Sequence, residues 1–82
     1  MEIQKNTIYK HYKGDFYVIE DFALNTETEQ TMVVYRGIYR DCPLFVRPIS
    51  MFTEKLPEDK QKQYGQEYRF QPVKVKSKNT DH

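Results

Sequence analysis

The sequence has a single cysteine, Cys42, no tryptophan and only two histidines, His11 and His82. One cysteine excludes an internal disulfide and a zinc site built from several cysteines. The sequence also lacks the HExxH, CxxC and glycine-rich patterns that bring catalytic or phosphate-binding groups together. Glu27 and Glu29 supply far fewer than the six or more oxygens that a hard cation prefers. We therefore expect a non-enzymatic protein with no catalytic residue, metal site or cofactor.

Long apolar runs and an excess of one charge are missing as well. No stretch approaches the roughly 20 apolar residues that a membrane span needs. The start of the chain has neither the basic beginning nor the apolar run of a signal peptide. We expect a cytoplasmic protein that does not contact a membrane. The formal net charge of +1 is too small for the strongly basic face of a nucleic-acid binder, so no nucleic-acid partner is expected.

The chain is instead rich in tyrosine and phenylalanine, which make up 15% of its 82 residues. Each buried ring removes roughly 150–250 Å² from water, so a few rings can build the core of a small domain. Apolar residues recur at every second position, a pattern that predicts strands rather than helices. The predicted strands span residues 7–12, 16–24, 31–39, 44–47 and 68–73.

Short strands separated by turn residues predict a mainly β fold, an SH3-like antiparallel barrel of about five strands. A single helical turn over 48–52, with proline at its start, precedes the last strand. Closing the barrel would remove exposed strand edges. The alternative is an open antiparallel sheet covered by residues 57–65. The charged stretch at 56–63 either loops out or forms a short exposed helix. We expect one domain over 1–73 and a flexible tail over 74–82.

Several residues are predicted to shape this domain locally. Glu20 and Asp21 interrupt the longest strand, which indicates a bend or a bulge. Gly37 interrupts the next strand and marks either a bulge or a close approach of the backbone to another group. Met51 and Phe52 are predicted to fill the core from the helical turn.

Candidate ligand-binding residues flank the first turn and the end of the fourth strand. His11 and Lys13 lie beside the turn at Gly14, where they either form a polar recognition loop or simply face water. Arg47 lies between a β-branched residue and a proline. Its guanidinium could bond backbone carbonyls, or it could hold a carboxylate or a phosphate.

A second group of candidates surrounds Gly37. Tyr35 and Tyr39 could stack a planar ligand while Arg36 holds its charge. The alternative is that both tyrosines are core residues and that Arg36 lies on the surface. Alternation places Tyr35 and Arg36 on opposite faces unless a bulge redirects one of them. We slightly favour a ligand-facing Arg36 and a structural Arg47.

Three motifs in order, HYKG at 11–14, VVYR at 33–36 and VRPxxMF at 46–52, resemble a bacterial and phage family, domain of unknown function 1653 (DUF1653). This chain has Phe45 where the family usually has tryptophan, and Asn25 where a histidine is common. The resemblance implies a compact β domain and supplies no activity. The polar residues within the matching motifs are His11, Lys13, Tyr35, Arg36 and Arg47.

The sequence thus predicts a non-enzymatic binding module with a groove lined by tyrosine, arginine and lysine. The expected ligand is a small anionic or planar molecule such as a nucleotide. The alternative is a protein-interaction domain, in which the aromatic surface docks a peptide or a second copy of the chain.

Overall fold

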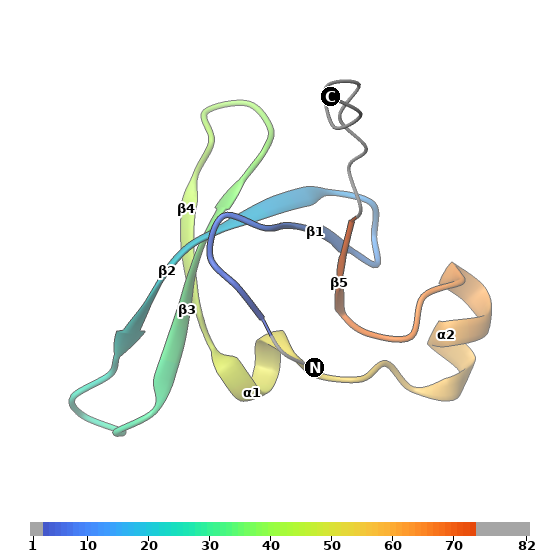
Figure 1. Ribbon diagram of the computed structural model, residues 1–82. Helices are drawn as coiled ribbons and strands as arrows, with labels where there is room; N and C mark the ends of the chain where they lie inside the picture. The colour runs from blue at the N-terminus through green and yellow to red at the C-terminus, as the bar shows by residue number, and fades with distance from the viewer. Residues whose placement is uncertain (1–2, 74–82) are drawn as a thin grey trace, which may run out of the picture.

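The computed structural model describes residues 3–73, so the predicted tail at 74–82 lies outside the described residues. Five antiparallel strands form one sheet in the order β4-β3-β2-β1-β5 (Figure 1). This confirms the mainly β, antiparallel prediction. The strands are β1 (Ile8–His11), β2 (Phe16–Leu24), β3 (Thr31–Gly37), β4 (Leu44–Pro48) and β5 (Phe70–Pro72).

The sheet is open, so the predicted closure into a barrel is wrong. β4 and β5 lie at the two ends of the strand order, and within residues 3–73 no backbone pairing joins them. Closure requires the two end strands to hydrogen-bond to each other. β5 has only three residues and pairs with β1 alone among the described strands. The chain adopts the open sheet of the alternative, without the cover by residues 57–65 that the alternative included.

Two short helices occur in the described part of the chain, and the second is the short exposed helix that was one of two alternatives for the charged stretch. The expected helical turn is α1 (Ile49–Phe52), directly after Pro48. The charged stretch forms α2 (Glu58–Tyr64), which ends at Gly65 in the left-handed conformation. α2 has no buried residue and projects beyond β5, so it does not cover the sheet (Figure 1). No helix within residues 3–73 is long and apolar enough to cross a membrane.

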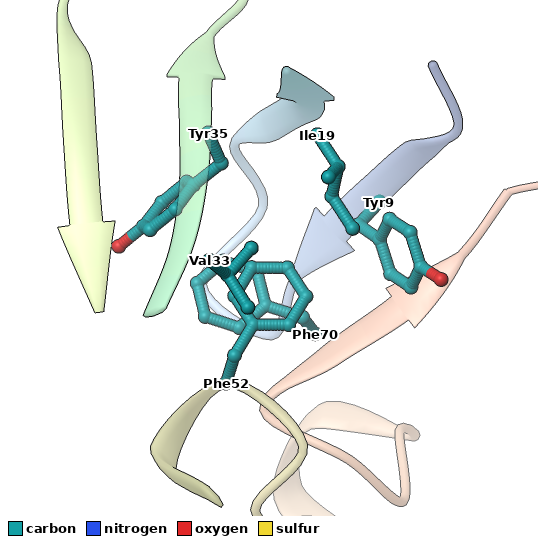
Figure 2. Close-up of a cluster of buried hydrophobic side chains, with 6 residues drawn as sticks. All are labelled: Tyr9, Ile19, Val33, Tyr35, Phe52 and Phe70. Carbon is teal, nitrogen blue, oxygen red and sulfur yellow. The ribbon is translucent and has the colours of Figure 1, made fainter. Parts of the chain in front are cut away.

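The core lies on one face of the sheet, which we call the inner face, and α1 contributes one ring to it (Figure 2). Phe52 of α1 stacks on Phe70 of β5 with ring centres 4.1 Å apart and planes nearly parallel. Met51, by contrast, is 46% exposed, so its predicted place in the core is wrong. Consecutive helical residues point about 100° apart, so a single turn can bury only one of the two. The buried core residues are Tyr9, Ile19, Val33, Tyr35, Phe52 and Phe70.

A β-bulge in β2 keeps apolar residues on the inner face. The pairing with β3 shifts between Ile19 and Asp21, which confirms the predicted irregularity. Ile19 lies opposite Tyr35, and Phe22, three residues further along, lies opposite Val33. The extra residue lets Ile19 and Phe22 both pack on the core despite their odd spacing.

Candidate functional site

Arg36 lies on the outer face of the sheet, opposite to the core. Its neighbours across the sheet are Val18 of β2 and Leu44 of β4. Its Nε donates a hydrogen bond to Glu20 Oε1 at 2.9 Å, and its Nη1 donates to the carbonyl oxygen of Cys42 at 2.7 Å. The Arg36 guanidinium therefore links β3 to β2 and to the turn before β4.

Arg47 lies on the inner face, where β4 pairs it with Val33. Its Nε donates a hydrogen bond to the hydroxyl of Tyr35 at 3.2 Å, and its guanidinium carbon lies 5.7 Å from the centre of the Phe70 ring. The Tyr35 hydroxyl points toward β4, the strand that carries Arg47 (Figure 2). Within residues 3–73, the guanidinium makes no other hydrogen bond and no ion pair with a carboxylate. Arg36 is thus held by two hydrogen bonds within the chain, and Arg47 by one.

His11 ends β1 on the inner face, opposite Phe70. Its ring meets the Phe70 ring edge-on at 5.0 Å and stacks on Tyr12 at 4.5 Å. Its Nδ1 accepts a hydrogen bond from the backbone N–H of Lys13 at 3.1 Å. Because Nδ1 is the acceptor, the neutral imidazole carries its proton on Nε2, which is then a hydrogen-bond donor.

Three positive side chains act on His11. Burial of the ring is the largest cause of its lowered pKa, and the charges of Arg69, Arg47 and Lys13 lower the pKa further. Asp15 opposes them with a smaller effect. Cations from β4, from the first turn and from the segment before β5 therefore surround one histidine.

Arg69 and Tyr17 lie close to His11 but were not among the candidates predicted from the sequence. The Arg69 guanidinium carbon lies 5.9 Å from the centre of the Tyr12 ring, and its Nη2 forms a 3.5 Å ion pair with Glu54. Burial also raises the pKa of the Tyr17 phenol, which stays protonated. The Tyr17 ring centre lies within 6.4 Å of the ring centres of His11, Tyr35, Tyr39, Phe45 and Phe70.

The structure gathers five of the six predicted site residues on the inner face. Tyr35 is buried within the core, while Tyr39 is half-buried over Gly37. Lys13 is exposed, with its Nζ 5.8 Å from the centre of the Tyr12 ring. Arg36 is the member that the sheet separates from the others. We refer to the following surface residues together as the inner-face site: His11, Lys13, Tyr17, Tyr39, Arg47 and Arg69.

The inner-face site is an open surface. Residues 3–73 form no pocket. In the same part of the chain, no three histidine, cysteine, aspartate or glutamate side chains are grouped so as to hold a metal ion.

Comparison with known proteins identifies the family and no activity. The model for a protein of unknown function, DUF1653, matches residues 7–72. The crystal structure of a DUF1653 protein from Bordetella bronchiseptica has a TM-score of 0.71 and 28% sequence identity to this chain, and the match covers 90% of this chain and 92% of that one. No curated protein matches. The chain therefore belongs to the DUF1653 family of proteins of unknown function.

Proposed function

We propose that this protein is a non-enzymatic binding module whose inner-face site holds a ligand with an anionic group next to a flat, apolar part. The observation that carries the proposal is the state of Arg47. Its guanidinium is anchored at Nε by Tyr35 and lies near the Phe70 ring, without a carboxylate partner in the described residues. An arginine that is held in one orientation and has no carboxylate partner within the described chain is suited to binding the anionic group of a ligand.

The neighbouring side chains supply the remaining contacts for an anion. The two amino groups of Arg47 can bind a carboxylate or phosphate through parallel hydrogen bonds. The Nε2–H of His11 is a further donor, because its Nδ1 is occupied by the Lys13 backbone. Lys13 adds an exposed positive charge that can move toward the ligand.

The aromatic part of the site suits a planar group. Tyr17 and Tyr39 are both half-buried, so each residue remains partly accessible to solvent. Rings of this kind stack flat ligands without requiring an enclosed cavity. A nucleoside phosphate combines both chemical features and is the first ligand class to test.

The first prediction concerns Arg47→Ala, with Arg36→Ala as the matched control because both remove one arginine from the sheet. Thermal unfolding of wild type is measured with nucleoside mono- and triphosphates and with inorganic phosphate. A ligand at about 100 times its Kd adds about 2.7 kcal/mol of stability, which is several degrees in Tm for a domain of this size. Arg47→Ala should weaken binding about 10- to 100-fold, whereas Arg36→Ala should retain it.

The unliganded variants separate ligand binding from a structural role. Arg36→Ala removes two internal hydrogen bonds and should lower stability more than Arg47→Ala, which removes one. If no anion stabilises wild type and Arg47→Ala alone costs about 1–3 kcal/mol, Arg47 is structural. The proposal then fails in favour of a protein-interaction domain.

A further inference from the structure

The outer face of the sheet exposes apolar side chains on three neighbouring strands. Leu44 and Val46 of β4 are 53% and 60% exposed, and Phe16 of β2 is 42% exposed. Val34 of β3 lies directly across from Val46. The outward residues of an antiparallel sheet with one covered face are normally polar. We refer to these four residues together as the outer-face patch: Phe16, Val34, Leu44 and Val46.

Nothing in residues 3–73 buries this patch. α1 supplies its ring to the inner face, and α2 has no buried residue. The stretch 74–82 offers one apolar side chain, Val75, among polar and charged residues. That composition does not match an apolar surface formed by four side chains. An apolar occupant of this patch would therefore come from another molecule.

The charges beside the patch indicate what that molecule is. Glu20 and Arg36 lie on the same face, 2.9 Å apart, and each is 40% exposed. The same face carries a second ion pair, Lys5–Asp21 at 3.1 Å, with Asp21 opposite Val34. A surface with paired negative and positive charges next to apolar residues can be complementary to itself when rotated by half a turn. Two-fold rotation can bring Arg36 of one copy toward Glu20 of the other. We propose that the outer-face patch binds a second copy of this chain in a two-fold dimer.

The contact we propose is between faces and not between strand edges. The inward Arg47 and the terminal Pro48 of β4 are features that protect an edge strand from pairing, since proline has no N–H to donate. Two copies packed by their outer faces leave both inner-face sites uncovered. This proposal therefore does not rest on the proposed function, and either can fail alone.

Sedimentation velocity of the full chain from about 5 to about 500 µM tests the dimer, because small interfaces associate in this range. The sedimentation coefficient of wild type should rise with concentration toward that of a dimer. Val46→Lys should weaken association about tenfold or more, because it places a charge in the apolar contact. Leu24→Lys is the matched control, since Leu24 is 64% exposed at the far end of β2, outside the patch.

A charge variant tests the two-fold arrangement. Glu20→Lys places a positive charge next to Arg36 in both copies, so association should fall as it does in Val46→Lys. Circular dichroism shows whether each variant keeps the fold. A wild type that stays monomeric at every concentration overturns the proposal. So does a dimer that Leu24→Lys weakens as much as Val46→Lys, or one that Val46→Lys leaves intact.

Discussion

At the residue scale, the inner-face site depends on Gly37, where the lack of a side chain makes room for Tyr39. A Cβ at this position would lie 2.5 Å from Cε2 and 2.7 Å from Cζ of Tyr39. Carbons that are not bonded to each other stay about 3.5 Å or more apart. Of the two predictions made for Gly37, the close approach is therefore the one observed. The approach lets the Tyr39 ring meet the Tyr17 ring at 5.8 Å.

We predict that Gly37→Ala displaces the Tyr39 ring and costs about 0.5–1.5 kcal/mol of stability, the value of one aromatic pair. The cost stays modest because the clashing atoms are at the end of a side chain that can rotate. Urea unfolding measures it. In a Tyr39→Ala background the same change should be nearly neutral, since the overlap is gone. An equal cost in both backgrounds would show that the backbone at Gly37, and not Tyr39, resists the alanine.

Sequence reasoning selected those residues of the proposed inner-face site that interrupt or end a strand, and it did not select those that owe their place to tertiary packing. His11 and Arg47 were found because each ends a strand beside a turn or a proline. Tyr17 lies within a strand like any core residue, and Arg69 approaches His11 only because β5 pairs with β1. Alternation did place Tyr35 and Arg36 on opposite faces. It could not tell which face the core would cover.

At the scale of the elements, the period-two pattern predicted all five strands, because alternation is a local property of each strand. Closure into a barrel depends instead on whether β4 and β5 pair with each other. The residues of these two strands carry no pattern that indicates which distant strand each one pairs with. A polar side chain in the segment before β5 connects that segment to β1. Gln66 is buried, and its Nε2 donates hydrogen bonds to the carbonyl oxygens of Lys10 at 3.0 Å and Tyr68 at 2.8 Å.

We predict that Gln66→Leu lowers the free energy of unfolding by about 1–3 kcal/mol, because it leaves carbonyl oxygens of β1 and of the segment before β5 unpaired. Gln63→Leu is the matched control, since Gln63 is an exposed residue of α2. Urea unfolding of both variants gives the comparison. Hydrogen exchange should also show faster opening of β5 in Gln66→Leu alone. Equal stability of the two variants would mean that β5 is held by its apolar contacts and not by Gln66.

At the scale of the whole molecule, one thin sheet has two faces with different chemistry. The inner face combines the aromatic core with cations from separate segments, and the outer face combines apolar residues with a balanced ion pair. A chain of 82 residues buries only roughly 60% of its unfolded surface, so much of each face remains available to other molecules. The same small size leaves a narrow margin of stability, which makes single ionisations measurable.

The pH dependence of unfolding should reveal the lowered pKa of His11. The folded state lowers the pKa of His11 below its ordinary value of 6.5, through burial and then through Arg69, Arg47 and Lys13. Below pH 6.5 the unfolded chain therefore binds more protons than the folded one, and stability must fall as the pH falls. The loss grows until the pH passes the lowered pKa of the folded state. Above pH 7.5, where both forms are neutral, His11 has no effect.

We predict that the free energy of unfolding of wild type falls between pH 7.5 and pH 5.5, and that His11→Gln flattens this dependence. His82, the other histidine, is present in both proteins, so the difference between their slopes reports His11 alone. Urea unfolding at several pH values measures both slopes. An anion bound beside His11 should offset the neighbouring cations and raise the pKa of the imidazole, so a saturating ligand should reduce the wild-type slope. Equal slopes in wild type and His11→Gln would contradict a lowered pKa of His11 in the folded state.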